Sequence, residues 1–138
     1  MIHDIEYRLV SIEEQQALQQ LQSETLDSTE KDSLKKQLNE WELDWVKTTI
    51  TDLSGGGIRF NSRNDLKAGD QIKVKLEFVT GGKPKKLIID SKIISVNKLL
   101  HASGVYECRV EFINIQQKDR EDLIKYIFEQ ERLRRKKN

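Results

Sequence analysis

Three consecutive glycines, at positions 55–57, follow an aspartate and a serine in the segment Asp52-Leu53-Ser54. Glycine adopts positive φ at no steric cost, and it lets a ligand approach the backbone closely. Successive amides in such a turn can form a concave site for an anion. Asp52 can accept hydrogen bonds from a ligand or from local amides, and Ser54 can donate to a phosphate or hold the turn. The segment therefore predicts either an anion-binding loop or an ordinary Asx turn between two strands.

Residue types that carry catalysis or bind metals are sparse in the rest of the sequence. His3 and His101 are far apart, and Cys108 is the only cysteine. A single cysteine forms no disulfide within the chain and no cysteine-based metal site. Ser54 lacks the Gly-x-Ser-x-Gly context of a nucleophile elbow, and no Gly-Lys-Ser/Thr follows the glycines as a P-loop requires. We therefore predict a binding module with no catalytic residues and no metal site.

The composition of the chain indicates which classes of partner, such as DNA or a membrane, it is expected to lack. Its 138 residues include 24 basic and 23 acidic ones, for a net charge of +1. This balance does not steer the chain toward DNA. No stretch resembles a secretory signal, and no apolar run approaches the roughly 18 residues that span a bilayer. The lone thiol fits a reducing compartment. These features predict a cytoplasmic protein that neither binds DNA nor inserts into a membrane.

Residues 11–45 have the pattern of a helical segment. Ser11 with Glu14, and Asp27 with Glu30, have the spacing of helix N-terminal caps. The pattern is interrupted at residues 26–29, so we predict a helical hairpin, with one bent helix as the alternative. Narrow apolar stripes suit packing on the rest of the chain or pairing with a second copy. The stripes contain Leu18, Leu21, Leu34, Leu38 and Trp41.

The rest of the chain has the period of two that indicates strands. Several short strands at regular spacing predict an antiparallel barrel or sandwich. After residue 114 the spacing changes to that of a helix, whose predicted apolar face contains Leu123, Ile124, Ile127 and Phe128. The strands are expected near residues 4–10, 46–52, 57–61, 71–79, 86–97 and 104–113, and the helix near 118–135.

The glycine segment resembles the D-x-S-x-x-G motif of the PilZ family, which Asp52, Ser54 and Gly57 match. Leu66–Asp70 is similar to the turn that follows in that family, and Tyr106–Phe112 is similar to a later strand. The resemblance covers roughly residues 46–131 and the strand at 3–10. It implies a mainly β fold, a six-stranded antiparallel PilZ-type β-barrel with a C-terminal helix. Residues 1–138 would then be a single domain, with 11–45 as a helical insertion after the first strand.

The resemblance also implies a function, which is binding of the bacterial second messenger cyclic di-GMP without catalysis and without another cofactor. The chain would act as an adaptor, because ligand binding changes a surface that a protein partner recognises. We expect Gly57 to tolerate substitution worst, since a side chain would strain a positive-φ turn and block the ligand. The residues that this resemblance places at the ligand are Asp52, Ser54, Gly55, Gly56, Gly57 and Arg59.

One part of the family pattern has no counterpart here. The family carries an R-x-x-x-R arm before its first barrel strand, and no such pair precedes residue 3. Arg59 and Arg63 have this spacing but follow the glycines, so we interpret their spacing as coincidence. We expect the arm to precede residue 1 in a longer natural protein. This chain would then bind the messenger much more weakly than that protein does.

Two other functions fit parts of the sequence. A protein-interaction or oligomerisation module with a degenerate ligand site would use the 11–45 helices to join copies of the chain. Trp41 and Trp45, four residues apart, either pack a helix end or form part of such a surface. An RNA-binding barrel fits less well, because the strands lack the interleaved aromatic residues that stack on bases. The basic tail at 132–137 is either a solvated helix end or a contact for an acidic partner or RNA.

Overall fold

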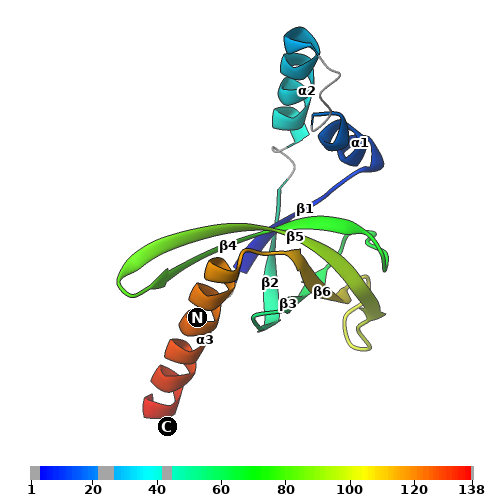
Figure 1. Cartoon of the computed structure of the whole chain (residues 1–138). Helices are drawn as coiled ribbons and strands as arrows, with labels where there is room; N and C mark the ends of the chain where they lie inside the picture. Colours follow the sequence, from blue (N-terminus) through cyan, green and yellow to red (C-terminus); the bar gives the residue numbers. More distant parts are fainter. Residues whose placement is uncertain (1–3, 22–26, 42–44, 138) are drawn as a thin grey trace.

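The computed structural model describes residues 4–21, 27–41 and 45–137. Six antiparallel strands close into a barrel in the order β1-β2-β3-β6-β5-β4 (Figure 1). This closure confirms the six-stranded antiparallel barrel predicted from the sequence. The strands are β1 (Asp4–Leu9), β2 (Val46–Leu53), β3 (Gly57–Ser62), β4 (Gln71–Thr80), β5 (Lys83–Lys98) and β6 (Tyr106–Asn114).

Alternate residues of the strands fill the barrel interior, because successive side chains of a strand point to opposite faces. Cys108 of β6 is fully buried in this core, and burial raises the pKa of its thiol to about 11. The thiol is therefore protonated at neutral pH and is a weak nucleophile. The period of two predicted for these strands is confirmed on β3 and β4, where the buried residues are Ile58, Phe60, Ile72, Val74, Leu76 and Phe78.

Strands β4 and β5 form a longer hairpin than the sequence predicted. Gly81 and Gly82 have φ values of 58° and 75°, so both central residues of this two-residue loop are left-handed. Such a loop matches the twist of the strands, and it lets pairing start at once. Thr80 accordingly lies opposite Lys83, and β5 begins at residue 83 instead of near 86.

Two helices, α1 (Ile12–Leu21) and α2 (Ser28–Trp41), lie between β1 and β2 in the chain. They contact each other, and α2 stands away from the barrel (Figure 1), whereas Gln15 and Gln19 of α1 line a hollow together with residues of β4. The cap at the start of α2 is confirmed, since Asp27 Oδ1 accepts the Glu30 amide at 2.7 Å. Among the predicted stripe residues, Leu21 is half-buried. The side chains of Leu18, Leu34, Leu38 and Trp41 lie outside the described parts of the chain, and the single-domain organisation of 1–138 stays a prediction.

Trp45, just before β2, packs on the outside of the barrel. The Lys75 ammonium lies 4.1 Å from the centre of its ring, and the Arg8 guanidinium carbon lies 5.6 Å from it. Cations over the face of an indole are attracted by its quadrupole. Of the two roles considered for the tryptophans, the structure shows packing for Trp45.

Helix α3 (Gln117–Lys137) follows β6 and rests on the barrel with its first half only (Figure 1). Leu123 and Tyr126 are buried, and the Tyr126 ring centre lies 5.0 Å from that of Phe78. The predicted apolar face is wrong in part, because Ile124 is 36% exposed and Phe128 is 62% exposed. The neighbouring Ile127 packs against the core, so Phe128 lies on the solvent side of the helix. Of the helices in the described ranges, none combines the length and hydropathy that crossing a membrane requires.

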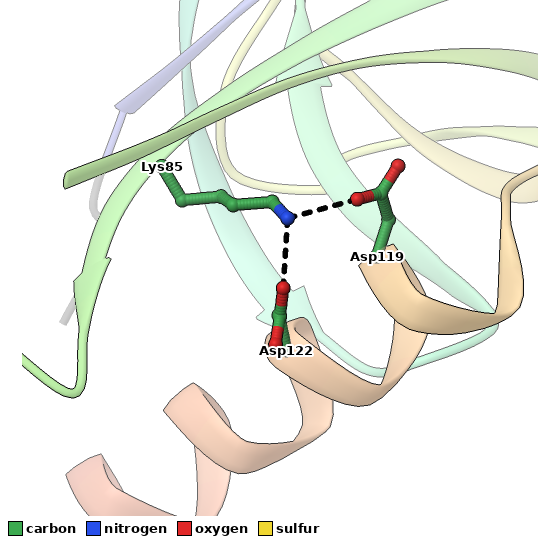
Figure 2. Close-up of polar contacts among 3 residues, drawn as sticks. All are labelled: Lys85, Asp119 and Asp122. Atoms are coloured by element: carbon green, nitrogen blue, oxygen red, sulfur yellow. Dashed lines mark hydrogen bonds and ion pairs between the residues drawn. The ribbon is translucent and has the colours of Figure 1, made fainter. Parts of the chain in front are cut away.

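A lysine between two aspartates ties α3 to the start of β5. Lys85 Nζ lies 2.7 Å from Asp122 Oδ2 and 2.9 Å from Asp119 Oδ1 (Figure 2). The hydrogen bond to Asp122, and after it the one to Asp119, raises the pKa of Lys85. The hydrogen bond from Lys85 in turn lowers the pKa of Asp122. Both side chains keep contact with solvent, so the link orients the helix more than it stabilises the fold.

The docking of α3 is expected to weaken in acid. Because the pKa of Asp122 is lowered in the folded protein, its attraction to Lys85 is complete above the ordinary value of 3.8. It is lost as the pH falls through the folded pKa. The measurement is the NMR shift of the Tyr126 ring between neutral pH and acid, with Lys85→Gln as the control that lacks the link. An equal pH response in both proteins would contradict this role.

Candidate functional site

The turn between β2 and β3 is closed by the side chain of Ser54. Its Oγ accepts the amides of Gly56 and Gly57 at 3.3 and 3.2 Å, and donates to the Gly57 carbonyl at 3.2 Å. The Ser54 amide donates to the same carbonyl at 3.0 Å. Two of the amides expected to cradle an anion are therefore bonded within the turn. Of the two roles considered for Ser54, the structure shows that of holding the turn.

Gly55 and Gly57 allow close packing with neighbouring elements, and none of the three glycines has a left-handed backbone. None of the three has a positive φ, so that prediction is wrong. A Cβ on Gly57 would overlap the carbonyl oxygen of Val110 on β6. A Cβ on Gly55 would lie 2.8 Å from Ile124 Cγ1 of α3, whereas one on Gly56 would meet open space. Gly57 therefore lies close against β6 and Gly55 close against α3, with the unhindered Gly56 between them.

Asp52 lies at the end of β2 with its side chain exposed. Its Oδ1 accepts the Leu53 amide at 3.0 Å. Within the described residues, Oδ2 makes no hydrogen bond that would occupy it. Asp52 lies opposite Arg59 in the β2–β3 register, beside a bulge after Ile50. One carboxylate oxygen is therefore free to accept a donor from a ligand next to an arginine.

Arg59 of β3 and Arg109 of β6 lie directly opposite each other. Both are exposed, and within the described parts of the chain neither guanidinium forms an ion pair. Like charges in directly opposed positions destabilise a sheet. An anion bound over the pair would remove this repulsion. The two arginines therefore form a cationic pair of a kind that favours phosphate.

These side chains surround one hollow of about 420 Å³ on the outside of the barrel. Five of the six predicted site residues line it, and Gly55 does not, because it faces α3. Arg109, Glu111 and Ile94 also line it, and the sequence analysis missed them. Strand alternation alone places Arg109 outward, but only the β3–β6 register places it beside Arg59. The lining consists of Asp52, Ser54, Gly56, Gly57, Ile58, Arg59, Ile94, Arg109, Val110 and Glu111.

The hollow contains groups for both charged and flat parts of a ligand. Arg59 and Arg109 supply guanidinium donors, and Asp52 and Glu111 supply carboxylate acceptors. Ile94, 43% exposed, offers an apolar surface beside them. Arginine forks pair with phosphate oxygens and with the acceptors of nucleobases, and they stack on flat rings. The arrangement suits an anionic ligand that also carries hydrogen-bond donors and a planar group.

The hollow is connected to helix α3 through the turn. The Phe112 amide, at the end of β6, donates to the Gly56 carbonyl at 2.9 Å. Gly55 packs against Ile124, and the Arg120 side chain lies close by. The turn that borders the hollow is therefore in contact with both β6 and α3.

A comparison with protein families finds a match to the model described as PilZ domain over residues 32–129. The matched residues include every residue that lines the hollow, five of the six strands and the first half of α3. The first strand and α1 lie outside the match. No curated protein matches the chain.

Proposed function

This chain belongs to the PilZ domain family, and on that premise we propose that it is a receptor for cyclic di-GMP. The messenger binds in the hollow beside the glycine turn and undergoes no chemistry there. The observation that carries the proposal is the placement of the motif residues Asp52 and Gly57 in one hollow with the opposed Arg59 and Arg109. Since the messenger is bacterial, we place the chain in a bacterial cytoplasm.

The chemistry of the hollow matches the chemistry of the messenger. Cyclic di-GMP has two anionic phosphates and two guanines. Arg59 and Arg109 pair with a phosphate or with guanine acceptors, and each such charged bond contributes about 1.5–3 kcal/mol. The free oxygen of Asp52 accepts from the N–H groups of a guanine edge. Ser54 acts indirectly, because it holds the turn that positions Asp52.

An arm before β1 would add to the same site. The register of β1 with β2 places Asp4 opposite Thr49, and β2 continues from there toward Asp52. A segment that precedes β1 therefore enters the barrel on the side of the hollow. Arginines on such a segment would supply further cations to the ligand, as the family pattern implies.

Replacing both Asp52 and Ser54 by alanine is expected to weaken cyclic di-GMP binding at least about tenfold, the equivalent of about 1.4 kcal/mol. The change removes one acceptor and loosens the turn, while both positions are exposed and leave the core intact. Isothermal titration calorimetry measures the affinity. The matched control is Asp65→Ala with Ser103→Ala, two exposed residues outside the hollow. If the site variant binds as tightly as the control, the hollow is not the site.

We further propose that a protein partner recognises the exposed side of α3. Ile124 links this helix to the glycine turn, and Phe128 and Leu133 are apolar side chains exposed at 62% and 52%. Ligand-induced displacement of the turn would move Ile124 and with it the surface that carries Phe128.

Ligand binding is accordingly expected to change amide hydrogen exchange in residues 119–128, although they lie outside the hollow. Ile124→Ala should leave the affinity within about threefold, equivalent to about 0.7 kcal/mol, and reduce this change in exchange. Leu133→Ala, farther along the same helix, is the control that keeps it. Identical exchange in α3 with and without ligand would show that the helix is not coupled to the site.

A second candidate is a module that joins copies of the chain. The observation in its favour is that α1 and α2 contact each other and that α2 stands away from the barrel (Figure 1). Light scattering after size-exclusion chromatography decides it. Oligomers that persist without ligand and are lost when residues 11–45 are replaced by a short linker would favour this function.

A further inference from the structure

A second hollow lies in the barrel wall, where β2 and β3 separate. The two strands pair from Leu53 and Ile58 as far as Ile50 and Phe60. Beyond that point residues 46–49 pair only with β1, and Asn61 and Ser62 pair only with β6. A side-chain bond from the Thr48 hydroxyl to the Asn61 carbonyl bridges the separation. The seam between the two strands is therefore open at this end.

The open seam forms a hollow of about 470 Å³ that reaches the polar part of the core. Tyr7 and Ser62, both buried, line it and lie 3.0 Å apart through their hydroxyl oxygens. The Asn64 side-chain amide donates to the Tyr7 oxygen at 2.7 Å, and the Asn64 backbone amide donates to Ser62 Oγ at 3.0 Å. This network holds a polar floor in place, and the volume is within the range of ligand pockets.

Asn61, which lines the hollow, has a side-chain oxygen without a partner. Its Oδ1 is buried, and within the described residues no hydrogen bond reaches it. A buried acceptor without a donor destabilises the folded protein, and such atoms are rare in native structures. A turn of the Asn61 side chain toward the hollow would expose this oxygen to a donor from a ligand.

The rim of the hollow is cationic. Lys47 and Arg63 line it and are exposed, and none of the described residues in its lining is acidic. Lys47 lies opposite Glu6 in the β1–β2 register, but the Glu6 carboxylate pairs with Lys75 at 3.2 Å. Within the described residues neither rim cation has an ion-pair partner. The charge of the rim is therefore available to an anion.

We propose that this seam hollow is a second ligand site, which takes a small phosphate-bearing molecule. The phosphate lies between Lys47 and Arg63, and the Asn61 side chain turns toward the hollow so that a hydroxyl of the ligand donates to its Oδ1. No residue lines both hollows, which lie at opposite ends of the β2–β3 pair. The site is therefore independent of the glycine turn and of the ligand proposed for it.

The test is an NMR titration of the full chain with inorganic phosphate, with GMP and with guanosine as separate probes. Saturable shifts of the amides in residues 47–49 and 61–64 are expected with phosphate or GMP. The probe that binds more tightly shows whether the site prefers free phosphate or a phosphate monoester. Guanosine should cause no such shifts. The proposal would be overturned if neither anion caused shifts at tens of millimolar. It would also be overturned if the shifts were confined to residues 52–59, or if guanosine caused equal shifts.

Variants separate this site from the first one. Lys47→Gln with Arg63→Gln should weaken the binding of the phosphate probes at least tenfold, whereas Lys86→Gln with Arg132→Gln, exposed elsewhere, should not. Arg59→Gln with Arg109→Gln should leave the seam shifts unchanged. If instead the Arg59 and Arg109 changes abolish them, the phosphate binds at the glycine turn and the seam is not a site. Spectral dispersion verifies that each variant is folded.

Discussion

Replacement of Arg59 and Arg109 together by glutamine is expected to weaken cyclic di-GMP binding by at least about a hundredfold. Each charged hydrogen bond contributes about 1.5–3 kcal/mol, so two of them at the lower limit give about 3 kcal/mol. A tenfold change in affinity corresponds to about 1.4 kcal/mol. The two arginines lie opposite each other on β3 and β6 and line the same hollow, so they contact one ligand. Calorimetric titration at one fixed salt concentration measures the loss.

The same variant should be at least as stable as the unmodified protein. Like charges opposite each other on neighbouring strands are destabilising, and the two side chains are exposed. Removing them relieves the repulsion and leaves the core unchanged. Thermal unfolding without ligand is the control, since it separates a binding defect from a folding defect. Undiminished affinity in the double variant would show that the messenger does not bind at Arg59 and Arg109.

Gly57→Ala is expected to destabilise the barrel by at least about 2 kcal/mol, which lowers the melting temperature on the order of 5–10 °C. A Cβ at this position would overlap the Val110 carbonyl oxygen, so β3 and β6 must move apart. The movement also displaces the Gly57 carbonyl, which accepts both the amide and the hydroxyl of Ser54. Ligand affinity should therefore fall together with stability.

Gly56→Ala is the matched control, one residue away in the same turn. A Cβ there meets open space, and its φ is not positive. At such a position alanine is tolerated and can stabilise by about 0.4–1 kcal/mol through the unfolded chain. Equal melting temperatures for the Gly56 and Gly57 variants would contradict the close contact between β3 and β6.

The barrel could be predicted from the sequence because the pattern that specifies its strands lies within each strand. Alternation of apolar residues, as in Ile72, Val74 and Leu76, specifies which face of a strand is buried. The glycine turn was also recognisable, but its physical reason was not. Its glycines were expected to adopt positive φ. Instead, Gly57 and Gly55 allow close contacts with Val110 and Ile124. Those contacts join segments more than 50 residues apart, so the local pattern does not contain them.

The cationic pair and the helix face show the same limit. Arg109 has no neighbour in the sequence that marks it, and only the strand order β3-β6 places it beside Arg59. On α3, spacing alone predicted that Phe128 would be buried. Instead, Tyr126 packs on Phe78 and Ile127 packs against the core, which leaves Phe128 exposed to solvent. Periodicity predicts an apolar face, but which residues of that face contact the barrel depends on how the helix rests on it.

The most direct test of the proposed receptor function is an NMR chemical-shift map of cyclic di-GMP on this chain. The account predicts saturable shifts in the amides of residues 52–59 and 109–111, and these shifts should weaken with rising salt because the contacts involve phosphate. Residues 47–49 and 61–64, at the seam, should not be the principal site for this ligand. The absence of saturable shifts at millimolar messenger, or shifts that leave residues 52–59 and 109–111 unaffected, would contradict the account.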